Sequence, residues 1–278
     1  MLQRAHQQLL DTIHRRMELT NGIWIEGSGW VAYDMGSDVS DSHLRGATAD
    51  VGCDTGSLLT TIERLRQPHH TQWSIRVHPD ALGELNAPLE QAGFHLDEPE
   101  GYPIMGISEP IDRALHHEVQ LVPLHHQSTC GQPHSQVKAG EQMMVDAVPA
   151  LQAAFTKLST RDATRLLSNG AWTSDPQWRA AVIYQDDAVI CFGKLTMNPA
   201  RTTGGLYYIS TDPRYRGQGL AKDLCTVLTN HAFALGAQEV ILQASTLGEF
   251  VYRHLGYTEI GRYYSFVKSY RDVEENQF

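Results

Sequence analysis

The chain has 278 residues, of which 41% are hydrophobic and 19% are charged; this composition excludes a disordered chain, a collagen and a coiled coil. Its 32 acidic and 22 basic residues give a net charge of −10, which disfavours general binding to nucleic-acid backbones. The length corresponds to one large domain or two small ones.

Cysteine and histidine spacing argues against a metal or redox site. None of the four cysteines belongs to a CxxC pair, and several of the fourteen histidines form adjacent pairs beside turn residues. We therefore predict free thiols and no metal. Residues 1–17 lack the apolar run of a signal peptide, and no apolar stretch approaches ~18 residues. We expect a soluble, cytoplasmic protein that binds neither membrane nor nucleic acid.

The N-terminal third predicts a short series of alternating elements. Apolar spacing indicates a helix over Leu58–Leu65, a strand over Trp73–Val77 and a helix over Ala81–Gln91, which ends at Gly93-Phe94. No glycine-rich turn precedes the first of these helices. The C-terminal part of the chain repeats this order, so we interpret the pattern as an internal duplication whose first copy is degenerate.

Two polar segments separate this third from the rest of the chain. Residues 109–117 form the first, His125 to Lys138 form the second, and Val119–Leu124 is a predicted strand between them. We place a domain boundary near residue 115, with domains at 1–115 and 116–278. The second segment then becomes a long loop, either a lid on the acceptor side or a disordered linker.

The C-terminal half predicts a mixed, mostly antiparallel sheet flanked by helices, an α/β (α+β) fold. Its order is β-β-β-α-β-α-β, and Asp186-Asp187 marks a hairpin turn. The expected helices run from Leu220 to Leu235, closed by Gly236, and over Phe250–Leu255. The expected strands are Trp178–Asp186, Ala188–Met197, Leu206–Thr211, Val240–Gln243 and Tyr257–Lys268.

A glycine-rich turn lies between the third strand and the long helix. Gly217 and Gly219 allow a tight turn, and the helix N-terminus that follows supplies free N–H groups and partial positive charge. Such a turn suits a phosphate or pyrophosphate. Neither Gly-Lys-Ser/Thr nor GxGxxG is present, which excludes a Walker A loop and a dinucleotide fingerprint. A strand–helix turn without a ligand remains the alternative.

Two motifs carry a resemblance to a known family. Arg216-Gly217-Gln218-Gly219-Leu220-Ala221 resembles the acetyl-CoA-binding motif R/Q-x-x-G-x-G/A of the GCN5-related N-acetyltransferase (GNAT) superfamily. Val251 to Tyr257 looks like that family's L-Y-x-K-x-G-F segment, and the order of elements from about residue 118 to 269 fits as well. The resemblance implies the GNAT fold in two halves, the first of them degenerate.

The resemblance also implies residue roles. Backbone amides from Gln218 through Leu220 to Ala221 would bind the pyrophosphate of acetyl-CoA, while Arg216 flanks the phosphates or anchors the turn. Tyr252 matches the general acid that protonates the CoA thiolate, although a core aromatic is the alternative. The remaining cofactor contacts implied are the backbone of Ile209, Ser210 and Thr211 toward the pantetheine arm, Gly217 within the turn, and Ser245 where the family often has Asn.

Besides Ser245, two positions depart from the family pattern. Tyr207 occupies the place of a frequent strand carboxylate, so a water chain or Glu249 would have to act as the base. Leu89 stands opposite Tyr252 in the first copy, which indicates that the N-terminal half binds no CoA. That half would pack on the catalytic half, shape the acceptor pocket or mediate a homodimer.

The function implied is an N-acetyltransferase that uses acetyl-CoA and a small-molecule or peptide amine, with direct attack. Cys225 lies at an apolar helix position, which favours packing over a covalent intermediate. The alternative is a non-catalytic acyl-CoA-binding or sensor protein, favoured by the missing carboxylate. The net charge disfavours a nucleic-acid-modifying enzyme.

Overall fold

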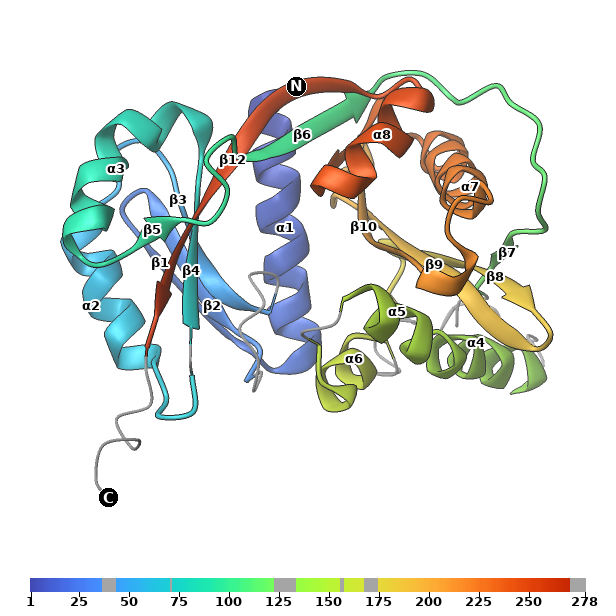
Figure 1. The fold of residues 1–278 in the computed structure, drawn as a ribbon, viewed down its shortest axis with the longest axis horizontal. Helices are drawn as coiled ribbons and strands as arrows, with labels where there is room; N and C mark the ends of the chain where they lie inside the picture. Colours follow the sequence, from blue (N-terminus) through green and yellow to red (C-terminus); the bar gives the residue numbers. More distant parts are fainter. Residues whose placement is uncertain (37–43, 71, 123–133, 156–157, 168–174, 271–278) are drawn as a thin grey trace. The chain divides into compact units, whose positions relative to one another are not determined.

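The computed structural model describes residues 1–36, 44–70, 72–122, 134–155, 158–167 and 175–270 (Figure 1). The chain divides into two units by its internal contacts. Unit 1 comprises Met1–Thr12 and Ile104–Ile260, and unit 2 comprises Ile13–Pro103 and Gly261–Phe278. The single boundary expected near residue 115 does not coincide with these divisions. A polar stretch marks a loop, whereas a unit is defined by pairing between segments far apart in sequence.

Unit 2 is built on a mixed, mostly antiparallel sheet, in which β3 and β4 are parallel to each other. Its strands pair in the order β1-β2-β3-β4-β12, and β5 also pairs with β12. The helices and strands predicted in the N-terminal third are confirmed. The elements are β1 (Ile23–Gly27), β2 (Trp30–Asp34), β3 (Arg45–Ala49), α2 (Thr55–Leu65), β4 (Gln72–Val77), the 3₁₀ turn η1 (Pro79–Ala81), α3 (Leu82–Gln91) and β5 (His95–Leu96).

Unit 1 contains the mixed, mostly antiparallel sheet predicted for the C-terminal half. Its strands pair in the order β6-β11-β10-β9-β8-β7, with β10 and β11 parallel. The elements are β7 (Gln120–Leu121), α4 (His134–Asp146), α5 (Val148–Ala154), α6 (Thr160–Leu167), β8 (Trp178–Gln185), β9 (Ala188–Met197), β10 (Thr203–Thr211), η2 (Pro213–Tyr215), α7 (Leu220–Ala234), β11 (Glu239–Gln243) and α8 (Thr246–His254). Three further elements, α1 (Leu2–Thr20), β6 (Tyr102–Ile107) and β12 (Thr258–Ser269), contain residues of both units.

Helices cover both faces of the unit 1 sheet. Figure 1 shows α7 on one side of β8, β9 and β10, and α4, α5 and α6 on the other. Gly193 of β9 lies directly under α7, where an added Cβ would stand 2.6 Å from Leu224 and 2.5 Å from Ile209. The absent side chain thus allows α7 to approach the sheet closely, which fixes the position of its N-terminus.

The turns of unit 1 follow the predicted chemistry. Asp186 and Asp187 both have positive φ (+49° and +61°), as a two-residue hairpin turn requires, and they join β8 to β9. Gly236 follows α7 with φ +106°, the expected left-handed helix end.

Two sequence predictions differ from the structure in the middle of the chain. Of the loop expected over residues 125–138, residues 125–133 lie outside the described part, and residues 134–138 belong to the start of α4. Glutamine, lysine, alanine, glutamate and methionine recur along the whole of α4, and these residues favour a helix. The strand predicted over Val119–Leu124 is described only as Gln120–Leu121.

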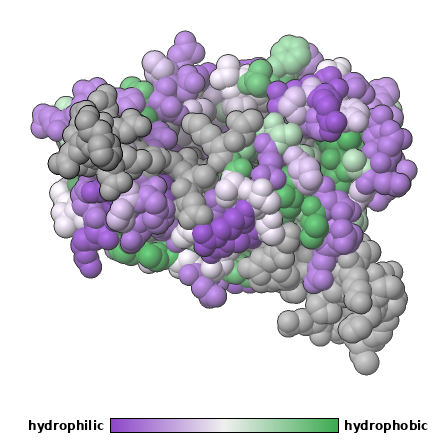
Figure 2. All heavy atoms as spheres, turned by 60° about the horizontal axis from the view of Figure 1, so that its bottom comes forward, coloured by the Kyte–Doolittle hydropathy of each residue, from purple (hydrophilic) through white to green (hydrophobic). Residues whose placement is uncertain are grey.

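Polar residues cover most of the coloured area on the face drawn in Figure 2, and hydrophobic residues form small groups between them. Leu247 and Phe250 of α8 are the most exposed large apolar side chains of the described residues, at 79% and 65%. Within the described part of the chain, no helix combines the length and apolarity needed to cross a bilayer.

Candidate active site

Strand β10 has a free backbone edge at its C-terminal end. It pairs with β11 only from Thr203 to Leu206, and its register against β9 shifts between Tyr207 and Ser210. Tyr208 at this bulge has a φ of +55°. Beyond the bulge, no described strand pairs with the edge that faces away from β9. Ile209, Ser210 and Thr211, the residues expected to contact the pantetheine arm, therefore lie on a part of β10 that β11 does not accompany.

The glycine-rich turn leads from this strand into α7. Gly217 and Gly219 have φ of +81° and +86°, and nothing lies within 4 Å of a Cβ added at either position. The first helical bond runs from the Asp223 amide to the Gly219 carbonyl at 3.1 Å. The amides that precede it, of Gln218 through Leu220 and Ala221, thus stand at the open N-terminus of a fifteen-residue helix. This geometry fits an anionic group such as a pyrophosphate.

Arginine side chains border the turn. Arg216 is exposed, and its Nε lies 3.4 Å from the Thr211 carbonyl, the anchoring contact that was one of its two predicted roles. Arg214 pairs with Asp212 at 2.7 Å. The hydrogen bond from Arg214 holds the pKa of the Asp212 carboxyl below its ordinary value. The Asp212 side chain also accepts a hydrogen bond from the Arg214 amide and so caps η2.

Tyr252 lies in the core of unit 1, with a side chain that is 7% exposed. Its ring makes an edge contact with Tyr257, with centroids 5.9 Å apart. Burial raises the pKa of Tyr252 well above its ordinary value, and the nearby Cys225, Tyr257 and Cys191 add to this effect. We find no hydrogen-bond partner for its hydroxyl among the described residues. The hydroxyl is therefore protonated at neutral pH and has no described partner that competes for its proton, although the raised pKa also makes it a weaker acid.

Ser245 is the N-cap of α8. Its side-chain oxygen accepts a hydrogen bond from the Gly248 amide at 3.2 Å. The hydroxyl hydrogen remains a donor, so the predicted contact with the pantetheine arm is compatible with this capping role.

The position of the missing base is occupied by Tyr207, and its cross-strand neighbour carries no carboxylate either. Tyr207 is directly opposite Lys194 of β9, so both side chains project from the same face of the sheet. Lys194 is only 2% exposed and its ammonium lies 4.9 Å from the Trp178 ring centroid. Sequence reasoning missed this buried lysine, although a lysine inside an apolar strand was a visible signal. Glu249, the carboxylate suggested as base, is bound by Arg253 at 2.7 Å.

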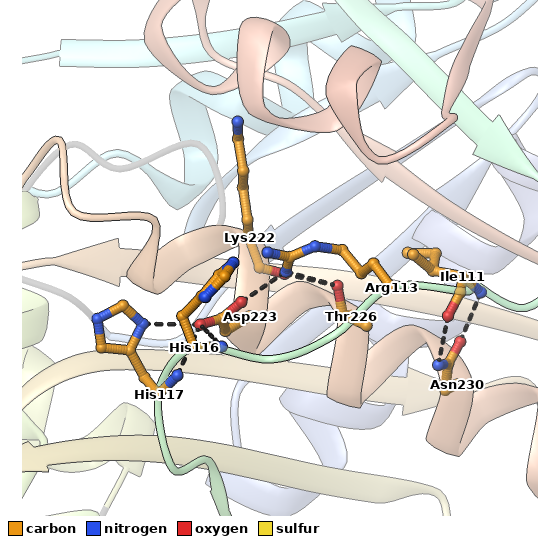
Figure 3. Close-up of polar contacts among 8 residues, drawn as sticks. All are labelled: Ile111, Arg113, His116, His117, Lys222, Asp223, Thr226 and Asn230. Carbon is orange, nitrogen blue, oxygen red and sulfur yellow. Dashed lines mark hydrogen bonds and ion pairs between the residues drawn. The ribbon is translucent and has the colours of Figure 1, made fainter.

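A buried carboxylate in α7 was also missed. Asp223 is 0% exposed and accepts hydrogen bonds from Arg113 Nη1 (2.5 Å), from the amides of His116 and His117 (both 3.0 Å) and from His117 Nδ1 (2.7 Å), as Figure 3 shows. Burial alone would raise the pKa of this carboxyl. The hydrogen bonds from His117, Arg113 and the His116 amide outweigh that effect and leave the pKa below its ordinary value.

The lowered pKa of Asp223 predicts a pH-dependent contribution to stability. The folded state holds the carboxyl in its ionised form more strongly than the unfolded chain, whose pKa is about 3.9. The stabilisation is therefore complete above that value and is lost as the pH falls through the folded pKa. Urea unfolding of the wild type and of Asp223→Asn should differ most at neutral pH, and the difference should shrink below about pH 4. The exposed Asp112→Asn should show no such loss; equal pH profiles for wild type and Asp223→Asn would contradict the assignment.

No metal centre is found in the described residues, since none of their His, Cys, Asp and Glu side chains gather in groups of three or more that could hold an ion. Cys191 and Cys225 are both buried. Burial raises the pKa of Cys191 to about 12 and that of Cys225 well above its usual value. Neither thiol is therefore in the thiolate form that a nucleophile requires.

Comparisons with known proteins match part of the chain to a family. Residues 145–257 match the model of a family described as "Acetyltransferase (GNAT) family". A GCN5-related N-acetyltransferase from Kribbella flavida has a similar structure, with a TM-score of 0.62 and 16% identity, covering 95% of this chain and 96% of that chain. No curated protein matches the chain.

Two further solved structures are similar over most of the chain. A functionally unknown conserved protein from Staphylococcus epidermidis has a TM-score of 0.57 and 14% identity, with coverage of 91% of this chain and 96% of that one. A GCN5-related N-acetyltransferase from Sphaerobacter thermophilus has a TM-score of 0.53 and 15% identity, covering 87% and 81% respectively. At these identities the likeness concerns the fold, which the three structures share well beyond residues 145–257.

Proposed function

Because residues 145–257 form an acetyltransferase domain of the GNAT family, we propose that the protein transfers an acetyl group from acetyl-CoA to a primary amine. The observation that carries this proposal is that two parts of the chain suited to bind a ligand follow each other along the chain: an unpaired strand edge and a glycine-rich turn at a helix N-terminus. The free edge of β10 ends at Thr211, and the open glycine turn at the start of α7 follows eight residues later, at Gly219. An extended chain that ends in a pyrophosphate would use both.

The residues divide the binding of acetyl-CoA between them. The backbone at Ile209–Thr211 would bond to the pantetheine amides and orient the thioester carbonyl. The amides from Gln218 to Ala221 would bind the pyrophosphate, with the positive end of α7 behind them. The Ser245 hydroxyl would add a donor to the pantetheine arm.

The transfer itself is a direct attack. The acceptor nitrogen forms a bond to the thioester carbonyl carbon, the carbon–sulfur bond breaks, and the products are an amide and CoA. Tyr252 donates its proton to the departing thiolate, for which its raised pKa keeps it protonated at neutral pH. The acceptor nitrogen loses its proton to water, since Glu249 is engaged by Arg253 and Tyr207 is no base at this pH.

The acceptor is a small molecule or a peptide with a primary amine. The chain carries a net charge of −10, which favours encounter with a cationic acceptor and opposes a polyanion. Self-association as a homodimer through the N-terminal half, residues 1–115, is a further proposal.

A non-catalytic acyl-CoA sensor is the second candidate, supported by the absence of a carboxylate at Tyr207. Release of free CoA thiol from acetyl-CoA, followed with a panel of small amines and amine-bearing peptides, tests the two against each other. We expect amine-dependent thiol release above the rate without protein. Tight acetyl-CoA binding by calorimetry with no amine-dependent release across the panel would instead support the sensor.

A further inference from the structure

Asp223 presents an electrostatic problem for the proposed cofactor site. Its amide forms the first helical bond of α7, to the Gly219 carbonyl, so this acidic residue belongs to the first turn of the helix whose N-terminal amides are proposed to bind pyrophosphate. The side chain is 0% exposed, so water screens its charge poorly. An uncompensated carboxylate at this place would repel an incoming phosphate group.

Arg113 supplies the compensating charge. Its Nη1 lies 2.5 Å from Asp223 Oδ1 and 3.4 Å from Thr226 Oγ1, and its side chain is 23% exposed (Figure 3). Its guanidinium is charged at any physiological pH. His117 adds a hydrogen bond through Nδ1, which must carry the proton because an ionised carboxylate can only accept. Arg113 is thus the one permanent cation among the partners that the structure describes for Asp223.

The segment that carries Arg113 has a second anchor on α7. The Ile111 amide donates to Asn230 Oδ1 at 2.7 Å, and Asn230 Nδ2 donates to the Ile111 carbonyl at 2.9 Å. Residues 111–117 are therefore held at two places along the helix. A substitution at Arg113 or Asp223 leaves the Asn230 contact intact, so such variants should fold.

We infer that Arg113 is a positioning residue for the acyl donor: by neutralising Asp223 inside α7, it preserves the affinity of the glycine turn for the phosphates of CoA. The inference rests on the proposed function, because it concerns the same turn. It assigns a role to the polar segment 109–117, which lies outside both of the family-like motifs. It also predicts that the two members of the pair act on binding in opposite directions, which a purely structural pair would not do.

Calorimetry with acetyl-CoA at low ionic strength tests the inference on the full chain. Arg113→Met exposes the cofactor phosphates to an unpaired carboxylate and should raise the Kd roughly tenfold. Arg113→Lys keeps the charge and should bind nearly as the wild type does. Asp223→Asn should bind at least as tightly as the wild type. The double variant Arg113→Met/Asp223→Asn should recover most of the lost affinity.

Two controls separate electrostatics from packing. Arg66→Met removes an arginine from an ion pair in unit 2, with Glu63 at 3.1 Å, and should leave the Kd unchanged. S-acetylpantetheine, an acyl donor without the pyrophosphate and nucleotide, should show the same KM with the wild type and Arg113→Met. Added salt should reduce the difference in Kd between these two proteins.

The outcomes discriminate among the explanations. A wild type that binds no acetyl-CoA overturns the proposed function and this inference with it. A wild type that binds, with an unchanged Kd in Arg113→Met, overturns the inference alone. Weaker binding in both single variants without recovery in the double variant would assign the pair a structural role and would also overturn it.

Discussion

Replacement of Tyr252 by phenylalanine is expected to lower kcat by roughly 10²–10⁴-fold, the usual contribution of general acid catalysis. The substitution removes the hydroxyl that would protonate the CoA thiolate and keeps the ring that packs in the core of unit 1. Because the hydroxyl has no hydrogen-bond partner among the described residues, its loss should leave the free energy of unfolding nearly unchanged. The Kd for acetyl-CoA should change far less than kcat, since the proposed phosphate site is on α7 and not on α8. Steady-state kinetics and calorimetry measure the two quantities.

Tyr257→Phe provides the matched control. Tyr257 is also buried in unit 1, but its hydroxyl lies 2.7 Å from Thr229 Oγ1. Its removal leaves a buried partner unsatisfied and should cost about 1–3 kcal/mol of stability with little change in kcat. A Tyr252→Phe enzyme with near-normal kcat, on an acceptor that the wild type uses, would mean that water supplies the proton and that Tyr252 is a packing residue.

Gly219→Asp should abolish measurable acetyl-CoA binding, with a Kd raised roughly 100-fold or more by a charge placed directly at the phosphate site. The added side chain would project into open space above the turn, where nothing described lies within 4 Å. The fold should survive, because aspartate tolerates the left-handed conformation better than most residues. Calorimetry measures the Kd, and circular dichroism with thermal unfolding checks the fold.

Two variants isolate the causes of that loss. Gly219→Asn has nearly the same size without the charge, so it should weaken binding less than Gly219→Asp. Gly52→Asp places the same residue at a glycine of unit 2 that also has positive φ (+75°) and open space around it. It should strain the backbone similarly and leave binding intact. If Gly219→Asp bound acetyl-CoA like the wild type, the assignment of the glycine turn to phosphate binding would be wrong.

Local patterns in the sequence determined most elements of unit 1. Alternating apolar runs predicted β8 and β9, and the Asp186-Asp187 pair predicted their turn, because two-residue hairpins require residues that accept positive φ. The same holds for α7: its apolar spacing, the glycines before it and Gly236 after it all act within a few residues. The predicted site at the start of α7 was visible because its backbone geometry depends on these neighbours alone.

Helix α1 was visible in the sequence and was missed. Ala5, Leu9, Ile13 and Met17 recur every four residues and are all 0–1% exposed in the structure. The test of residues 1–17 for a signal peptide did not use this helical period. The period places the apolar residues on one face of an otherwise polar helix, and that face is buried.

The tertiary structure alone decided the features that join distant segments. The free edge of β10 depends on how far β11 accompanies it, which is set by pairing between residues 36 apart in sequence, such as Thr203 and Glu239. The contact of Arg113 with Asp223 spans 110 residues, and no local pattern in either segment selects the other. Such contacts form because a buried carboxylate must be paired, and only the folded chain determines which cation is within reach.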